Sequence, residues 1–367
     1  MKVTHIAYEH TPNDIRIFRK ECIALYKCGY QVSYITSNKS GVEADEYSGV
    51  QKIIIPLKNT RYIRLFLYLA KLKTILKCSD SEIFHIHEEA LLPLVSFLIK
   101  RGKIVIYDAH EVPLEMKSSM NHGAIKKLFI KWLIWYERKA VSKAHYIISV
   151  TPSLVRYFKQ YNERVAMITN YPLVNSNVNA RNVQERLLGF AGVVDSEWHH
   201  KEIVEAINQV GNVEYLLAGP RNERYYNSLL QIDGWEKVTF YGYIPHSEVK
   251  EKIYDRIAIG LALLRDSNLP EEGTLGNNKL FEFMEQGIPV ISSDYSLWRE
   301  IVEGNQCGVC VDPENVDQIR DAILLLLRNP QMRTEMGQNG RTAVMQKYNW
   351  ETQRQILLEV YKEVSSR

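Results

Sequence analysis

The fold of this chain is constrained most by the alternation of short apolar stretches with longer segments of helical periodicity, which runs along most of the sequence. This alternation is typical of βαβ units, whose strands pair in parallel while helices cover the faces of the sheet. In the first half, strands are predicted at Val3–Tyr8, Gln31–Thr36, Ile53–Ile55, Ile83–Ile86, Ile104–Tyr107 and Tyr146–Val150. In the second half, strands are predicted at Leu187–Ala191, Glu214–Ala218, Val238–Tyr241, Ile257–Leu264 and Pro289–Ser292.

A polar, Asn-rich stretch from Pro172 to Asn182 separates the two halves and reads as a linker. The 367 residues are about two domains' worth of chain. We therefore predict an α/β protein with two Rossmann-like, doubly wound domains, residues 1–172 and 173–350. In such sheets, ligands bind outside the carboxyl ends of the strands.

The composition is that of an ordinary globular protein, with 46% hydrophobic and 24% charged residues. Five cysteines form an odd, sparse set that argues against a disulfide framework. Cys307 and Cys310 have redox or zinc spacing but no second pair, so we interpret them as small residues of a strand leading into Val311. The start shows no secretory signal and no apolar run suffices to span a bilayer, so we expect a cytoplasmic chain, or one peripheral on the inner face of the cell membrane.

The net charge of +3 conceals an asymmetry between the halves. Residues 1–170 carry 26 Lys and Arg against 15 Asp and Glu, whereas the remainder carries 20 against 28. A basic first half suits a phosphate-bearing acceptor or an anionic membrane surface. No nucleic-acid-binding motif accompanies the charge, so no nucleic-acid partner is expected.

A helix is predicted from Asn278 to Gly287, beside a glycine-containing loop and ahead of an apolar strand. The free amides of a helix N-terminus bind anions. Lys279 would add a cation in the first turn, and Glu282 could accept hydrogen bonds from sugar hydroxyls one turn on. A buried amphipathic helix with merely solvated Lys and Glu side chains is the alternative.

This region, GTLGNNKLFEFMEQGIPVISSDYSLWREIV (residues 273–302), resembles the nucleotide-binding region of GT-B glycosyltransferases, most of all glycosyltransferase family 4. The resemblance implies that the two domains face each other across a cleft. Residues 1–172 would be the acceptor side, with the helix at 351–367 packing back on them, and residues 173–350 would bind the nucleotide sugar. It implies that the donor-binding residues are Thr274, Gly276, Asn277, Asn278, Lys201 and Gly192, and that Lys279 and Glu282 act in catalysis.

Two departures from the family pattern concern the donor side. Thr274 stands where many relatives have a first glutamate, so either Glu271 or Glu272 substitutes by a loop shift or Thr274 supplies only a hydroxyl. No arginine follows Gly192, so Lys201, Lys279 and a histidine would neutralise the phosphates.

In the first half, His110 and Glu111 follow the strand that ends at Tyr107. Asp-Ala-His-Glu resembles the family segment whose histidine lies against the donor sugar, which implies a catalytic His110; a hydrogen-bonded structural histidine is the alternative. Glu111 would line the cleft with it. His87 is expected to line the cleft and His85 to have no role, because as metal ligands the two lack a third partner.

The loop after the first strand lacks the glycines that the family often has there. Asn13 or Asp14 can cap the next helix, and Arg16 can reach a phosphate. All three are acceptor-side candidates, with a plain cap and surface loop as the alternative.

One predicted helix is a candidate for binding to a membrane surface. Between Ile125 and Lys139, the apolar side chains Leu128, Phe129, Trp132 and Tyr136 share one arc, and basic side chains share another. The helix either lies on an anionic bilayer or packs on the sheet.

The resemblance implies a hexosyltransferase that moves a sugar from a nucleoside-diphosphate sugar, UDP being the expected nucleotide, to a glycan or lipid-linked acceptor. The resemblance implies retention of configuration and a role in surface polysaccharide biosynthesis. No cofactor is expected. No metal is expected either, because no Asp-x-Asp pair follows a strand. A nucleotide-sugar epimerase and a non-catalytic protein that binds sugar nucleotides or membranes are the alternatives.

Overall fold

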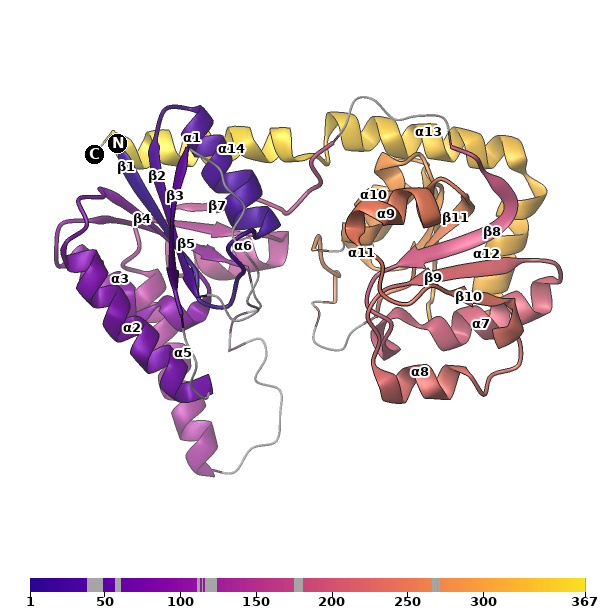
Figure 1. Ribbon diagram of the computed structural model, residues 1–367, viewed down its shortest axis with the longest axis horizontal. Coiled ribbons are helices and arrows are strands. Elements are labelled where there is room, and N and C mark those ends of the chain that lie inside the picture. The colour runs from indigo at the N-terminus through magenta and orange to yellow at the C-terminus, as the bar shows by residue number, and fades with distance from the viewer. Residues whose placement is uncertain are drawn as a thin grey trace. The chain divides into compact units, whose positions relative to one another are not determined.

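The computed structural model describes residues 1–37, 49–56, 61–110, 113, 115, 124–174, 181–265, 269, 271–276 and 278–366. The chain divides into two compact units, Met1–Asn170 with Glu351–Arg367, and Tyr171–Trp350 (Figure 1). This division lies two residues before the boundary that we placed at 172. The terminal residues from 351 belong to the first unit.

The first unit is built on a seven-stranded sheet in which every pairing is parallel. The strand order is β3-β2-β1-β4-β5-β6-β7, so the direction of winding reverses between β1 and β4. The strands are β1 (Lys2–Ile6), β2 (Gln31–Ser37), β3 (Val50–Ile55), β4 (Ile83–His87), β5 (Ile104–Ala109), β6 (Tyr146–Ser149) and β7 (Val165–Met167).

Helices cover both faces of this sheet, as Figure 1 shows. A wide helical turn with π-type hydrogen bonding, Ile15–Cys22, leads into α1. The remaining helices of the unit are α1 (Ile23–Lys27), α2 (Arg61–Lys77), α3 (Pro93–Ile99), α5 (Ala124–Val141), α6 (Pro152–Lys159) and α14 (Trp350–Ser365). α14 is tied to the unit by hydrogen bonds, among them one from the Thr169 amide to Gln353 at 2.8 Å.

Local sequence explains several of these helix ends. The Asp14 carboxylate accepts a hydrogen bond from the amide of Ile17 at 2.8 Å, so Asp14 is the cap, one of the two residues predicted for that role. Thr151 caps α6 in the same way, with Pro152 in the first helical position. Gly29 follows α1 with a φ of +89°, a conformation that glycine adopts readily.

The second unit holds a six-stranded parallel sheet of order β10-β9-β8-β11-β12-β13. Its winding reverses between β8 and β11. The strands are β8 (Gln184–Ala191), β9 (Glu214–Ala218), β10 (Val238–Phe240), β11 (Ile257–Ala262), β12 (Val290–Ser293) and β13 (Gly308–Val311). The helices are α7 (His200–Val210), α8 (Glu223–Leu229), α9 (His246–Val249), α10 (Asn278–Glu285), α11 (Ser296–Val302), α12 (Val316–Arg328) and α13 (Pro330–Gln346), with a π-type turn at Lys250–Tyr254 after α9.

Each unit has its own apolar core between sheet and helices. The strands of both sheets are largely buried, which explains why they read as continuous apolar runs rather than as alternating patterns. β7 is a short strand that the sequence analysis did not predict, and its three residues are only half-buried. Among the helices of the described residues, none is both long enough and apolar enough to cross a membrane.

Candidate functional site

In the second unit, the point where the winding reverses lies between β8 and β11, and ligands of doubly wound sheets bind beside such a point. Gly192 directly follows β8, and α10 is the helix that follows β11. A Cβ atom placed on Gly192 would lie 3.3 Å from Cε of Lys279. The structure therefore brings the glycine after β8 together with the first turn of α10.

Glycine is required at this meeting point for steric reasons. The same added Cβ would lie 2.6 Å from the ring of Phe190, which is buried. Gly219 packs on the other side: a Cβ there would lie 1.8 Å from the carbonyl oxygen of Gly192. The backbone at residue 192 is thus approached closely from two directions, as in sites where backbone must come near a ligand.

Lys279 and Glu282 form an ion pair within the first turn of α10. Lys279 Nζ lies 2.9 Å from Glu282 Oε2, and both side chains are mostly buried. The buried hydroxyl of Tyr254 donates a hydrogen bond to the same carboxylate oxygen. Burial, together with Glu282, raises the pKa of Tyr254 well above its ordinary value. Tyr254 therefore stays protonated, and its hydroxyl group orients the carboxylate of Glu282 by donating a hydrogen bond to it.

The other predicted donor-side residues lie at the start of α10 or just before it, and at the start of α7. Thr274 accepts a hydrogen bond from the Gly276 amide through its hydroxyl at 3.0 Å, and Gly276 and Asn278 are exposed. Lys201 lies in the first turn of α7, half-exposed, with Nζ 3.8 Å from Glu205. Asn277 lies outside the described residues.

The sequence analysis missed an ion pair at the same edge of the sheet. Arg265 follows β11, Asp294 follows β12, and their side chains meet at 2.6 Å. Asp312, just after β13, lies 3.5 Å from the same guanidinium. Each of three consecutive apolar strands is followed by a charged residue, and this pattern could have indicated the cluster.

In the first unit, the winding reverses between β1 and β4, and polar side chains gather just beyond the carboxyl ends of these strands. His10 Nδ1 lies 2.8 Å from Asp14 and His10 Nε2 lies 3.3 Å from Glu88. Glu88 has a φ of +80°, and such conformations cost about 1–3 kcal/mol and cluster at functional sites. Burial raises the pKa of Glu88 to about 7.

His110 borders this group at the end of β5. Its ring lies 5.7 Å from the ring of His10, and its Nε2 lies 3.0 Å from Nδ1 of His87. Burial holds the pKa of His110 well below its ordinary value, although Asp108 opposes that shift. His110 is therefore neutral near pH 7 and can both donate and accept a hydrogen bond.

Two acceptor-side predictions need correction. His87 does not line an open surface: its side chain is buried, because it points inward from β4 among other histidines. Arg16 does not reach outward either. Its guanidinium is buried, binds both carboxylate oxygens of Asp108 at 3.1 and 3.0 Å, and donates to the Ile168 carbonyl at 2.9 Å. Charge pairing inside the unit thus replaces the predicted contact with a phosphate.

The remaining acceptor-side predictions are Asn13, Asp14 and Glu111. Asn13 accepts a hydrogen bond from Lys52 at 3.0 Å, and Asp14 caps the helical turn. Glu111 lies outside the described residues.

A second feature that sequence reasoning missed is the set of partners around His87. We assigned no role to His85, and His5 and Glu21 were not considered, yet all four side chains are fully buried and lie together. His85 and His87 lie two apart on one strand, hence on one face of the sheet, and this was the available signal.

Comparison with known proteins agrees with this architecture. The family model "Glycosyl transferases group 1" matches residues 174–343, and "Glycosyltransferase Family 4" matches residues 18–171. Between them these models span most of the sequence. The chain belongs to the GT-B glycosyltransferases of the family 4 type, as the resemblance implied.

Individual relatives are distant. The chain is 21% identical to the alpha-D-kanosaminyltransferase of Streptomyces kanamyceticus over 252 residues, which are 63% of each protein. It is 35% identical over 66 residues to a GDP-mannose-dependent phosphatidylinositol monomannoside mannosyltransferase of Mycobacterium tuberculosis, covering 18% of this chain and 17% of that protein. The matches thus span less than two thirds of the length of these relatives.

Solved structures share the fold. A sucrose-phosphate synthase from Thermosynechococcus elongatus matches with a TM-score of 0.75 at 17% identity, covering 100% of this chain and 99% of that one. HepE of Anabaena in complex with UDP-glucose matches with a TM-score of 0.71 at 15% identity, covering 99% and 100%.

Proposed function

We propose that this chain is a metal-independent hexosyltransferase that moves a sugar from a nucleoside-diphosphate sugar to a glycan or lipid-linked acceptor. The observation that carries the proposal is the Lys279–Glu282 pair, held at the start of α10 against Gly192, where the winding of the sheet reverses. The family membership of the chain supports the same reaction.

The pair divides the recognition of the donor between two side chains. Lys279 would neutralise part of the negative charge of the diphosphate, and the free amides at the start of α10 would bind it as well. Glu282 would then turn its carboxylate to the ribose hydroxyls, while Tyr254 holds one of its oxygens in place. The contact between Lys279 and Glu282 would be replaced by contacts with the ligand, while the hydrogen bond from Tyr254 keeps the carboxylate of Glu282 ordered and so limits the conformational freedom lost on binding.

For the transfer step, we assign His110 a hydrogen bond to the sugar being moved. A neutral histidine at the carboxyl edge of the first sheet can donate to a sugar hydroxyl without carrying a fixed charge. No carboxylate is assigned as a covalent nucleophile. The proposal is therefore a front-face displacement with retention, in which the leaving diphosphate accepts the proton of the acceptor hydroxyl.

The nucleotide is expected to be UDP. UDP is bound in HepE, which has the same fold, whereas the mycobacterial relative is named for GDP-mannose. Calorimetric titration of the purified chain with UDP, GDP and ADP decides among them. Incubation with the matching sugar nucleotides and a lipid-linked or glycan acceptor then tests transfer, and an anomeric assignment of the product by NMR tests retention.

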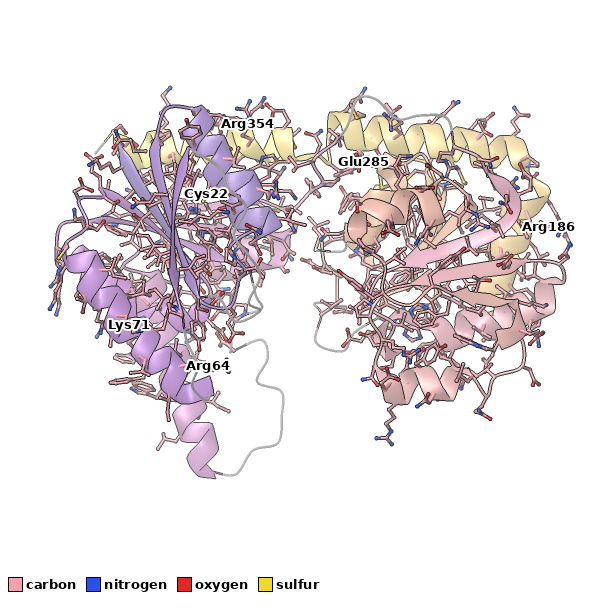
Figure 2. All side chains as sticks on the ribbon, viewed as in Figure 1. Cys22, Arg64, Lys71, Arg186, Glu285 and Arg354 are labelled. Atoms are coloured by element: carbon pink, nitrogen blue, oxygen red, sulfur yellow. The ribbon has the colours of Figure 1, made fainter. Side chains whose placement is uncertain are left out.

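An acceptor at a membrane, as in surface polysaccharide biosynthesis, is supported by helix α5. Leu128, Trp132 and Trp135 on it are 71%, 53% and 51% exposed, and Lys131 and Lys139 accompany them. Helix α2 adds the exposed Phe66. It also adds the exposed Lys71, whose position is labelled in Figure 2. Aromatic and basic side chains exposed on the same helices suit the boundary of an anionic bilayer.

Co-sedimentation tests this membrane surface. The chain is expected to bind vesicles that contain anionic lipid and to lose most of that binding in the Trp132→Ser, Trp135→Ser double variant. Equal binding by both proteins would remove the membrane surface from the proposal and leave sugar transfer untouched.

The same transfer assay separates the alternatives. An epimerase would interconvert free sugar nucleotides without an acceptor. A non-catalytic protein would bind the sugar nucleotide but neither hydrolyse it nor transfer the sugar with any acceptor.

A further inference from the structure

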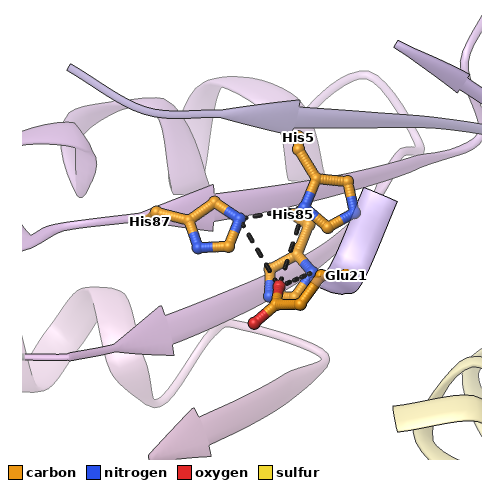
Figure 3. Close-up of side chains that lie close together, drawn as sticks. All are labelled: His5, Glu21, His85 and His87. Atoms are coloured by element: carbon orange, nitrogen blue, oxygen red, sulfur yellow. Dashed lines mark hydrogen bonds and ion pairs between the residues drawn. The ribbon is translucent and has the colours of Figure 1, made fainter. Parts of the chain in front are cut away.

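Four side chains that can bind metals meet in the interior of the first unit (Figure 3). His5 comes from β1, His85 and His87 come from β4, and Glu21 comes from the π-type turn before α1. All four side chains have no solvent exposure. The parallel register places His5 directly opposite His85, so the sheet itself aligns the three imidazoles.

The distances within this group bracket those of a coordination shell, although one pair of imidazoles is also within hydrogen-bond distance. Glu21 Oε2 lies 3.9 Å from each of three ring nitrogens, His5 Nδ1, His85 Nδ1 and His87 Nε2. His5 Nδ1 and His87 Nε2 are 2.9 Å apart. A tetrahedral zinc ion with bonds of about 2.0–2.1 Å holds its donor atoms about 3.3–3.4 Å apart, which lies between these two values.

Glu21 has few partners for a fully buried carboxylate. Neither of its carboxylate oxygens has a hydrogen-bond partner, although both are buried. Oε1 lies 3.2 Å from Nε of Arg16, while Oε2 faces the three imidazoles. Buried polar atoms are satisfied in the great majority of cases, so an exception of this kind calls for an unseen partner.

The buried charges leave room for a positively charged partner. Glu21 and Asp108 bring two carboxylates, and Arg16 brings one guanidinium, which pairs with both. One negative charge is left over in the interior, and an uncompensated buried charge is costly. Either a cation or a proton must offset it.

The surroundings of the imidazoles match a second shell for a metal. Asp108 Oδ2 lies 3.5 Å from His87 Nδ1, a ring nitrogen that faces away from Glu21. It lies 3.8 Å from His85 Nε2, which is beyond hydrogen-bond distance, so that nitrogen has no hydrogen-bond partner. The hydroxyl of Tyr361 on α14 lies 3.2 Å from His5 Nε2. Metal-bound histidines usually direct their second nitrogen to such carboxylates and hydroxyls. Tyr361 also bonds His85 Nδ1 at 2.9 Å, a hydrogen bond that a metal would replace.

We propose that His5, Glu21, His85 and His87 form a closed zinc site that fastens the π-type turn to strands β1 and β4. Three imidazoles and one carboxylate are ligands that zinc prefers, and four protein ligands without an open position characterise a structural site. The ion would carry no part of the sugar transfer. The inference does not depend on the proposed function.

The test is made on the full chain without a histidine tag. Protein stripped with a chelator is titrated with Zn²⁺ against a chromophoric competitor, and Co²⁺ is added in parallel because its visible absorption reports four-coordinate geometry. Glu21→Gln and His5→Asn are compared with two matched controls, Glu137→Gln, a buried glutamate of the same unit, and His200→Asn, a buried histidine of the other unit.

We expect one zinc per chain in the parent protein and in both controls, a four-coordinate cobalt spectrum, and a rise of the melting temperature on adding zinc. Glu21→Gln and His5→Asn should weaken zinc binding by about 100-fold or more, since loss of a second-shell partner alone costs 10- to 100-fold. If a variant does not fold, the stoichiometry and cobalt spectrum of the parent chain still decide.

Three results would overturn the site. They are a folded, stripped parent chain that takes up no stoichiometric zinc, equal affinity in Glu21→Gln, and loss of zinc in a control variant. The first would mean that a proton on Glu21, not a metal, offsets the buried charge.

Discussion

Replacement of Glu282 by alanine tests the donor site most directly. In the structure, the carboxylate of Glu282 is mostly buried, ion-paired with Lys279 at 2.9 Å and hydrogen-bonded by Tyr254. If it binds the ribose, its removal costs a charged hydrogen bond, about 1.5–3 kcal/mol. At 1.4 kcal/mol per factor of ten, the dissociation constant of the nucleotide should rise by about 10- to 150-fold.

The assay is isothermal titration of the parent and variant with the nucleoside and with its diphosphate. A ribose contact is present in both ligands, so both affinities should fall by a similar factor. The matched control is Glu285→Ala, which removes a carboxylate from the last turn of the same helix (Figure 2). Its nucleotide affinity should stay within about twofold of the parent, since the partly buried Glu285 lies at the opposite end of the helix from Lys279 and is assigned no contact with the nucleotide.

The reasoning fails if folded Glu282→Ala binds the nucleoside as tightly as the parent does. It also fails if Glu285→Ala loses as much affinity as Glu282→Ala, because the effect would then belong to the helix as a whole.

Three further predictions concern single side chains. Lys279→Ala should weaken binding of the diphosphate far more than binding of the nucleoside, measured by the same titrations, and equal losses would contradict its role as the counter-charge of the phosphates. His110→Ala should lower turnover with saturating donor by about 100-fold or more while nucleotide affinity changes little, and near-normal turnover would return His110 to a structural role. Arg16→Met should destabilise the chain by about 3–5 kcal/mol in urea unfolding, because it leaves Asp108 buried without its partner, and a loss below about 1 kcal/mol would refute that pairing.

Much of the fold could be predicted from short stretches of sequence. The periodicity of side chains and the residues that start and stop helices are local properties, and they placed most of the strands and α10 within a few residues of their observed bounds. The cap was narrowed to Asn13 or Asp14 for the same reason, because a cap depends on the three residues after it, and the structure shows Asp14 in that role. The donor motif around Lys279 is also continuous in the chain, so its parts needed no knowledge of tertiary contacts.

The polar interior of the first unit was beyond such reasoning. His5 and His85 are neighbours only because β1 lies beside β4 in the sheet, and the strand order is set by crossover connections that periodicity does not specify. Arg16 reads as a surface cation in a helical segment, yet it pairs with Asp108, which follows it by 92 residues. The sequence by itself determined most of the strands and helices, because their patterns are local. The tertiary structure alone decided which charges are buried together, because that depends on packing between distant segments.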